Sequence, residues 1–184
     1  MNRDFGFSLI EVLVVTTVIA VVSTVLILNF RPSTTNEASF NRAASLVVAD
    51  FRKTQSEASS LVLYGGQPAC GYGIHYVDKS TYIVYAGLTS GGASCASSSR
   101  GYQSSIDATV ETKKLINDKL EFRSSFKDIF FEPPDPKTYL QNDASPGANP
   151  ETITIIEKGG NNCTQAKCIY IDIYTSGRIE IRTQ

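Results

Sequence analysis

Hydrophobic residues are distributed unevenly along the 184 residues of this chain, and their spacing changes twice. From Phe7 to Phe30 most positions are apolar, and no charged residue occurs in this run after Glu11. A helix over this run would measure about 36 Å, at about 1.5 Å per residue, which exceeds a hydrocarbon core of about 30 Å. Because lipid forces the backbone to satisfy its own hydrogen bonds, the pattern predicts a membrane-spanning helix over 7–30.

The second segment, 31–62, has the spacing of an amphipathic helix. Its apolar residues fall on one helical face, namely Phe40, Ala44, Val47, Phe51 and Ala58. We therefore expect a helix over about 35–60. It would continue from the first helix through a kink or a loosened turn at 29–33, because a proline disfavours helical geometry at the residue before it.

From residue 63 onward the spacing becomes that of β-strands, with β-branched and aromatic runs separated by turn-forming residues. Residues 71–77 and 80–87 form a predicted hairpin with its turn at Asp78-Lys79, and a second predicted hairpin turns at Ser176-Gly177. The remaining predicted strands lie within 107–116, 119–124, 128–134, 151–158, 168–174 and 178–183. The Gly/Ser-rich segment 88–105 and the polar segment 135–150 are expected to be loops.

These patterns together predict an α+β protein. A long N-terminal helix, half transmembrane and half amphipathic, packs on an antiparallel β-sheet domain at 63–184. In the last two predicted strands isoleucines alternate with polar residues, which indicates one buried and one exposed face. The formal net charge of −1 gives no general attraction to nucleic acid, so such binding would need a local basic patch.

The start of the chain has features that a plain membrane anchor does not explain. It reads MNRDFGFSLIEVLVV, so that Gly6 precedes Phe7 and a glutamate, Glu11, lies within the apolar run. A carboxylate at the centre of a bilayer costs about 2.5–3.5 kcal/mol. The run is also longer than the apolar part of a secretory signal, and no small-residue cleavage site follows it. The position of Glu11 therefore needs an explanation.

This stretch resembles the N-terminal signature of type IV pilins and of the pseudopilins of type II secretion. In that family a prepilin peptidase cleaves after a glycine, here Gly6, and methylates the new N-terminal residue, here Phe7. The resemblance implies a cleaved leader at 1–6 and a helix at 7–30 that crosses the bacterial inner membrane once. It also implies a globular domain outside the cytoplasm, and transfer by an inner-membrane assembly platform into an extracellular or periplasmic filament of pilin subunits.

The resemblance also implies a partner for Glu11. Cleavage creates an α-ammonium group, which is mostly protonated at neutral pH. In the family this cation pairs with the glutamate of an adjacent subunit, so Glu11 is expected to set subunit register during assembly. The alternative is that the Glu11 side chain reaches back to the membrane surface without a partner.

The β-rich part more loosely resembles the GspH/FimT-type minor pseudopilins. Three segments carry this likeness, namely 71–87, FFEPPDPKTYL at 130–140 and IYTSGRIEIR at 173–182. The resemblance implies a minor subunit of a type IV pilus or of a type II secretion-like filament. A major pilin is an alternative.

A second alternative is a DNA-binding minor pilin for natural DNA uptake. FimT-like proteins use a C-terminal G-R-x-R motif, and here Gly177 and Arg178 match it, but Glu180 takes the place of the second arginine. Arg182 follows two positions later, on the same strand face as Arg178. Glu180 would repel phosphate, and an edge strand whose charges prevent aggregation explains the arginines equally well.

Four cysteines are present, Cys70, Cys95, Cys163 and Cys168, and disulfides persist outside the cytoplasm. They allow three pairings. We favour 70–95, which would tie the ends of the first hairpin, together with 163–168, which would close a short turn. A zinc site with four cysteines would need two short spacings, and only the second is short.

The sequence contains no catalytic motif that we recognise, so we expect neither an enzyme nor a cofactor or metal. His75 lies within a predicted strand and is expected on the sheet surface. Oxygen ligands for calcium could come from the loop residues Asp135, Asn142, Asp143 and Asn149. Their spacing does not form a calcium-binding loop that we recognise, so solvated turn residues explain them better.

Overall fold

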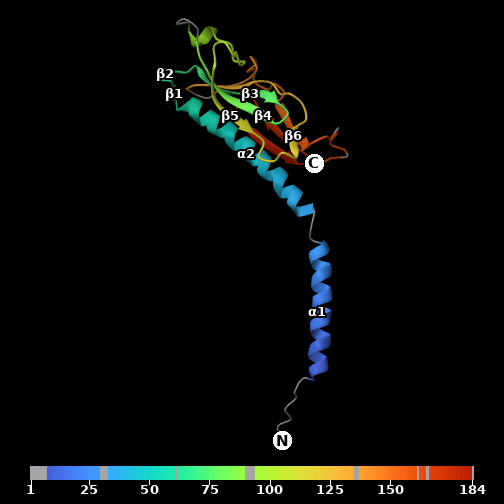
Figure 1. Cartoon of the computed structure of the whole chain (residues 1–184). Coiled ribbons are helices and arrows are strands. Elements are labelled where there is room, and N and C mark those ends of the chain that lie inside the picture. Colours follow the sequence, from blue (N-terminus) through green and yellow to red (C-terminus); the bar gives the residue numbers. More distant parts are fainter. Residues whose placement is uncertain are drawn as a thin grey trace. The chain divides into compact units, whose positions relative to one another are not determined.

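A computed structural model describes residues 8–29, 33–60, 62–89, 94–134, 137–160, 162–164 and 166–183. They fall into two compact units, Met1–Ser39 and Phe40–Gln184. The helices are α1 (Leu9–Asn29), α2 (Ser33–Ser59) and the short 3₁₀ helix η1 (Cys95–Ser97) (Figure 1). The strands are β1 (Leu63–Tyr64), β2 (Gln67–Pro68), β3 (Gly71–Asp78), β4 (Thr81–Gly87), β5 (Ala108–Lys114), β6 (Leu120–Phe122), β7 (Ile129–Glu132), β8 (Lys137–Leu140), β9 (Glu151–Glu157), β10 (Cys168–Ile173) and β11 (Ile179–Thr183).

Helix α1 is apolar on all sides. The stretch Leu9–Leu26 has a mean hydropathy of 2.5, and none of its side chains is buried. Its threonine hydroxyls bond within the helix, as when Thr24 donates to the carbonyl of Ala20 at 2.8 Å, so they leave no unsatisfied donor on the surface. The 21 residues of α1 span about 32 Å, so the helix is long and apolar enough to cross a membrane.

Helix α2 begins slightly earlier than its predicted start near residue 35, and ends close to the predicted residue 60. The predicted apolar face is confirmed, because all five of its residues are at most 2% exposed: Phe40, Ala44, Val47, Phe51 and Ala58. Residues 30–32, where we expected the kink or loosened turn, lie outside the described residues.

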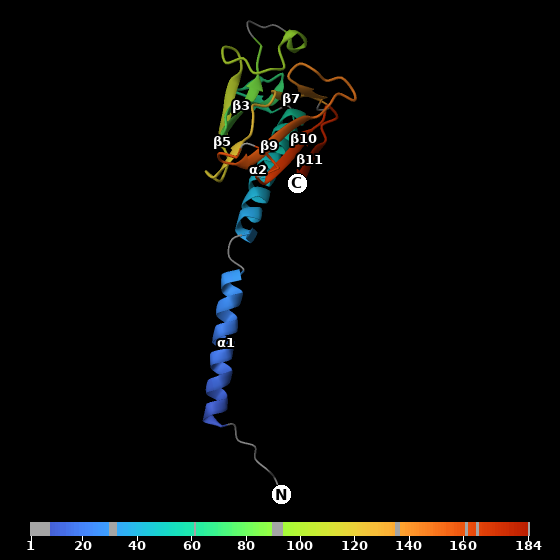
Figure 2. The same ribbon diagram turned by 90° about the vertical axis from the view of Figure 1, so that its right-hand side faces the viewer.

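The strands form two larger antiparallel sheets and a two-stranded ribbon of β1 and β2. The five-stranded sheet has the order β5-β4-β3-β7-β8, and the four-stranded sheet has the order β11-β10-β9-β6. Both sheets lie on the same side of α2 (Figures 1 and 2). The predicted α+β class, with helix packed on antiparallel sheet, is confirmed.

An aromatic cluster joins the two sheets. Phe122 from β6 is fully buried and meets Phe126 edge-on, with ring centroids 5.4 Å apart. Phe126 in turn meets Tyr76 of β3 at 5.3 Å, and Phe122 meets Tyr82 of β4 at 6.0 Å. Edge-to-face pairs at these distances stabilise a core beyond simple area burial. The core therefore continues from one sheet into the other beneath α2.

Two sequence predictions are wrong in detail. The first hairpin turns at Lys79-Ser80, one residue later than predicted. Asp78 still belongs to the strand, because it pairs with Thr81. Its carboxylate accepts hydrogen bonds from the backbone N–H and the hydroxyl of Ser80 and so holds the turn. The polar segment expected to be a loop contains β8, which pairs with β7. Only four residues long, β8 is too short for its alternation to stand out, and its pairing with β7 stabilises it.

The outer face of the five-stranded sheet carries a second aromatic layer over glycines. Tyr85 and Phe130 are at most 2% exposed although neither belongs to the core cluster that includes α2. A Cβ atom at Gly73 would lie 2.5 Å from the Tyr85 ring, and one at Gly87 would lie 2.7 Å from the Phe130 ring. These glycines therefore leave the space that the two rings occupy.

We expect Gly73→Ala to lower the free energy of unfolding by about 1–3 kcal/mol, because the new methyl group overpacks against the Tyr85 ring. Urea unfolding of the full chain in detergent, followed by tyrosine fluorescence, measures this. The Tyr85→Leu variant removes the ring, so the double variant should lose less stability than the sum of the two single variants. Additive losses would show that the ring does not restrict residue 73.

Candidate assembly site

Glu11 lies in the first turn of α1, where the serine before the helix positions it. The Ser8 hydroxyl accepts a hydrogen bond from the Ile10 backbone at 3.3 Å, and the Ser8 carbonyl accepts one from the Glu11 backbone at 3.0 Å. Ser8 thus caps the helix, and Glu11 lies where the helix dipole favours a carboxylate. The spacing of Ser8 and Glu11 is that of a capping box, a local signal for the helix start that the apolar run alone does not reveal.

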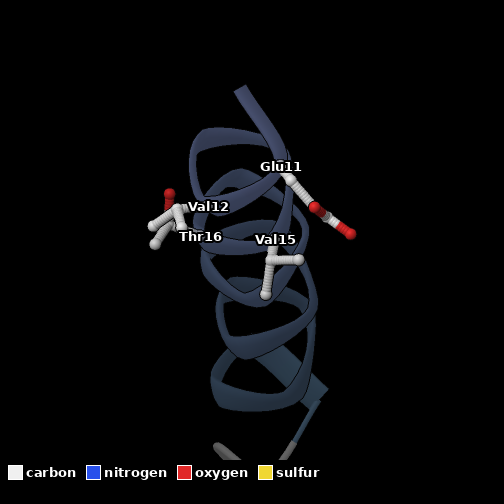
Figure 3. Close-up of a pocket in the computed structure, with 4 residues that line it drawn as sticks. All are labelled: Glu11, Val12, Val15 and Thr16. Atoms are coloured by element: carbon white, nitrogen blue, oxygen red, sulfur yellow. The ribbon is translucent and has the colours of Figure 1, made fainter. Parts of the chain in front are cut away.

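The surroundings of Glu11 are apolar. Val12, Val15 and Thr16 are its neighbours on the exposed surface of α1 (Figure 3). Glu11 is the only charged residue between Leu9 and Asn29. A single carboxylate on an otherwise apolar helix can pair with one cation from another chain. Gly6 and Phe7, the predicted cleavage and methylation positions, lie outside the described residues.

Residues 1–27 match the family model described as the prokaryotic N-terminal methylation motif. The chain carries a type IV pilin-like signal. The motif indicates a prepilin-type substrate, and it implies processing by a prepilin peptidase and assembly with other pilins in general. The apolar helix α1 fits the membrane anchoring of such a protein. Comparison with curated proteins and with solved structures gave no match.

Both favoured disulfides are present in the structure. Cys70 and Cys95 are bridged with their Cα atoms 5.3 Å apart, and Cys163 and Cys168 with theirs 5.4 Å apart. The first bridge ties the start of β3 to η1, and the second closes the turn before β10. Among the described residues no group of three or more His, Cys, Asp or Glu side chains could hold a metal ion.

The residues considered as calcium ligands take part in turn contacts. Asn142 accepts a hydrogen bond from the Arg100 backbone at 3.0 Å, and Asp143 accepts one from the Ser145 backbone at 2.8 Å. Asn149 is exposed, whereas Asp135 lies outside the described residues. The structure thus gives the oxygens of Asn142 and Asp143 a role in holding loops.

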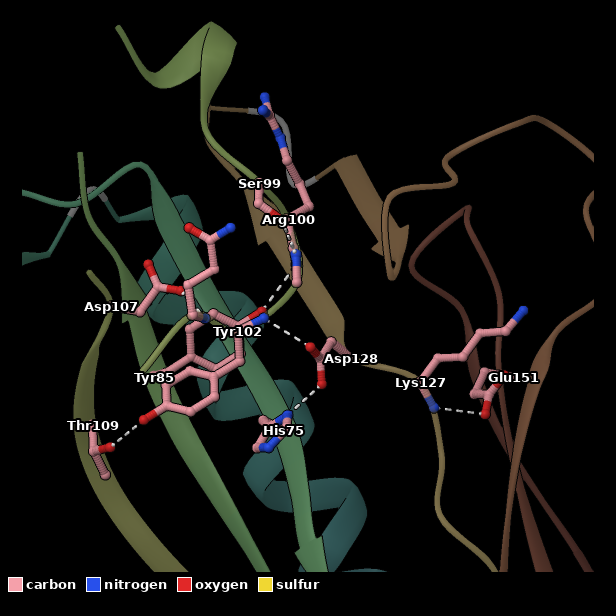
Figure 4. A network of polar contacts seen from close by, with 12 residues as sticks. His75, Tyr85, Ser99, Arg100, Tyr102, Asp107, Thr109, Lys127, Asp128 and Glu151 are labelled. Atoms are coloured by element: carbon pink, nitrogen blue, oxygen red, sulfur yellow. Dashed lines mark hydrogen bonds and ion pairs between the residues drawn. The ribbon is translucent and has the colours of Figure 1, made fainter. Parts of the chain in front are cut away.

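His75 is not a free surface histidine. Its Nδ1 atom lies 2.6 Å from Oδ1 of Asp128, and its ring contacts the Tyr102 ring in a tilted arrangement with centroids 4.6 Å apart (Figure 4). The other oxygen of Asp128 accepts a hydrogen bond from the Tyr102 backbone at 2.7 Å. Asp128 thereby fastens the Gly/Ser-rich loop to β3, a contact that sequence could not reveal because its members lie far apart along the chain.

A second set of contacts fastens the same loop. The Arg100 guanidinium lies 2.5 Å from the Glu132 carboxylate of β7, and the Tyr85 hydroxyl donates to the Arg100 carbonyl at 2.9 Å. Asp107 accepts from the Gln103 backbone at 2.7 Å. Apart from η1, the described part of the predicted loop 88–105 is irregular, as expected, but it covers the aromatic layer of the five-stranded sheet rather than projecting freely.

The two arginines considered for DNA binding both lie beside carboxylates. Arg178 is 3.3 Å from Glu180 and stacks on the Tyr174 ring at 4.0 Å. Arg182 forms a two-point ion pair with Asp172, with one of its hydrogen bonds at 3.0 Å. Partner carboxylates offset both positive charges and so weaken any attraction to phosphate.

Asp172 departs from the predicted alternation in the last strands. The pattern placed it on the exposed face of β10, but it is only 2% exposed because Arg182 and Thr152 cover it. Hydrogen bonds from Arg182 lower the pKa of Asp172; burial opposes this shift, and the Thr152 hydroxyl adds to it. Ile181, predicted on the buried face, is 43% exposed because β11 is the outermost strand of its sheet.

Because its pKa is lowered in the folded state, ionised Asp172 stabilises the fold above its unfolded pKa of about 3.9. This stability is lost as the pH falls through the lower, folded pKa. We expect Asp172→Asn to cost about 1–3 kcal/mol at pH 7 and progressively less below about pH 4. Urea unfolding at a series of pH values measures the difference. Asp118→Asn, at an exposed position, is the control, and a pH-independent loss at Asp172 would contradict the ion-pair explanation.

Proposed function

We propose that this protein is a minor pilin or pseudopilin, a structural subunit of a type IV pilus or of a type II secretion-like filament. In this proposal it is cut after Gly6, methylated on Phe7 and assembled through its apolar N-terminal helix. The observation that carries the proposal is the position of Glu11, the only charge on α1, five residues after Gly6 within the matched motif.

The exposure of α1 supports assembly through this helix. A helix that is apolar on every side needs lipid or other apolar helices around it. Lipid provides this environment for the precursor, and the α1 helices of other subunits provide it in a filament. In both environments the Glu11 carboxylate is costly unless it is paired. The α-ammonium group of a neighbouring processed subunit supplies a cation of the right charge.

The globular part supports a structural role over an enzymatic one. Several of its buried or partly buried polar groups serve the fold: Asp128 holds a loop, Asp172 holds β11 to β10, and the Tyr82 hydroxyl donates to Asp50 of α2 at 2.5 Å. Two disulfides stabilise the same part, as suits a domain outside the cytoplasm. We therefore propose a displayed domain without catalytic activity.

The minor role rests on the likeness of 71–87, 130–140 and 173–182 to GspH/FimT-type pseudopilins. A major pilin would dominate the filament mass in the native cell, so subunit abundance in sheared filaments separates the two roles. No contact in the described part of the chain favours the DNA-uptake alternative, since Arg178 and Arg182 both lie beside carboxylates.

Processing predicts the mass of the mature protein. Protein extracted from membranes of the native cell should begin with N-methyl-Phe7 and lack the four thiol hydrogens of its cysteines. Intact and top-down mass spectrometry measures both features at once. A chain that still begins at Met1 in a cell with an active prepilin peptidase would contradict the proposal.

The pairing of Glu11 predicts a charge-specific assembly defect. Glu11→Gln keeps the size of the side chain but removes its charge, so cleavage should stay largely intact while incorporation into filaments falls. Immunoblots of cell-bound and sheared fractions measure this. Glu37→Gln, the same change at an exposed position of α2, is the matched control and should assemble normally. Normal incorporation of the Glu11 variant would show that the pairing is dispensable.

A further inference from the structure

Strand β11 is an open edge of the four-stranded sheet. Among the strands of the described residues it pairs only with β10, and its last three residues are exposed. Figure 2 shows it as the outermost strand of its sheet. The edge strand β5 of the other sheet is protected by an irregularity in its pairing with β4 and by Lys113 and Lys114. The pairing of β11 with β10 has no such irregularity.

The backbone groups that point outward from β11 follow from its pairing with β10. The Tyr174 N–H donates to the Arg178 carbonyl at 3.0 Å, so residue 178 directs its backbone groups toward β10. Along an antiparallel strand this direction alternates, and residues 180 and 182 therefore also face β10. The outward N–H and C=O groups belong to Ile179, Ile181 and Thr183. These groups are available to a further strand.

The charges of β11 form a self-complementary pattern. Two copies of β11 can pair antiparallel through these outward groups only when outward-facing residues lie opposite each other. The registers centred on residue 180 and on residue 181 both meet this condition. The register with residue 180 on the two-fold axis places Glu180 opposite Glu180 of the second copy and Arg178 opposite its Arg182, so that every charged pair repels. The register with Ile181 on the axis places Glu180 of each copy opposite Arg182 of the other, which gives two attractive pairs. Cross-strand pairs of opposite charge stabilise a sheet, and like charges destabilise it.

The register centred on residue 181 also brings an exposed apolar side chain against its counterpart in the second copy. Ile181, which is 43% exposed, would meet Ile181 of the second copy across the two-fold axis. Glu180 and Arg182 are 41% and 58% exposed, so both can reach a neighbouring chain while keeping their contacts to Arg178 and Asp172. The edge therefore offers hydrogen bonds, one apolar contact and two ion pairs to an identical strand.

We propose that β11 is a self-association surface, at which a second copy of this chain adds its own β11 antiparallel with residue 181 on the two-fold axis. The two four-stranded sheets then form one continuous sheet across both copies. This proposal is independent of the processing and assembly roles of α1. It uses only the edge of the globular part.

Cysteine cross-linking of the full chain in detergent micelles tests the register. The described cysteines are all bridged, so Ile181→Cys adds a single free thiol. In the proposed register the two thiols face each other with Cα atoms about 5.5 Å apart, which suits a disulfide. Mild oxidation should convert the variant to a covalent dimer. Thr183→Cys is the matched control, because it is exposed on the same strand but pairs with residue 179 of the second copy.

Charge reversal tests the ion pairs. Glu180→Lys in the Ile181→Cys background sets lysine against Arg182 of the second copy. Within its own chain the lysine lies opposite Asp172 but loses the contact of Glu180 to Arg178, so thermal unfolding of the variant is measured alongside to separate a folding defect from weaker association. The yield of cross-linked dimer at limiting protein concentration should fall, because the dissociation constant of the pair rises about tenfold. This corresponds to a loss of about 1.4 kcal/mol in binding free energy. Glu157→Lys, the same change at an exposed position of β9, should leave the yield unchanged.

Three outcomes would overturn the proposal. Equal cross-linking at residues 181 and 183 would indicate random collision or association through α1 alone. Stronger cross-linking of Glu180→Cys than of Ile181→Cys would indicate a different register. The absence of cross-linking at every position, with thermal unfolding unchanged, would show that the edge stays unpaired.

Discussion

Burial of one face of α2 against both sheets is the interaction on which the globular part depends. The buried apolar residues of α2 and of both sheets form one continuous hydrophobic cluster. Phe40 and Phe51 of α2 and Phe122 of β6 lose nearly all contact with solvent in this arrangement. Each buried aromatic or aliphatic side chain contributes about 1.5–3 kcal/mol relative to its exposed state, so the helix stabilises both sheets at once.

Helix α1 has no comparable partner within its own unit. Its side chains are exposed from Leu9 to Leu26, and its threonine hydroxyls bond back to the helix backbone. Such a surface must be covered by lipid or by other helices. The same chain thus combines an amphipathic helix that completes a water-soluble core with an apolar helix that needs an external environment, and Glu11 is the one charge that this environment must accommodate.

On the outer faces of the sheets, carboxylates hold the parts that the hydrophobic core does not reach. Asp128 bonds to His75 and to the Tyr102 backbone, and it fixes the loop that covers Tyr85. Asp172 accepts from Thr152 and Arg182, and it joins three neighbouring strands. Each carboxylate accepts at least two hydrogen bonds, which offsets the cost of its partial burial. The polar clusters of this domain are therefore part of its architecture.

Sequence by itself determined the elements whose signal is local and periodic. These are the apolar run of α1 with Glu11 near its start, the buried face of α2 and the alternating isoleucines of β10. The favoured disulfide pairing also followed from the positions of the cysteines relative to the predicted strands. Only the tertiary structure decided the contacts between residues far apart in the sequence. It pairs the carboxylate of Asp128 with the loop at Tyr102, the carboxylate of Asp172 with Arg182, and strand β8 with β7. These contacts depend on three-dimensional proximity, because a carboxylate or a short strand acquires its partner only after the sheets have assembled.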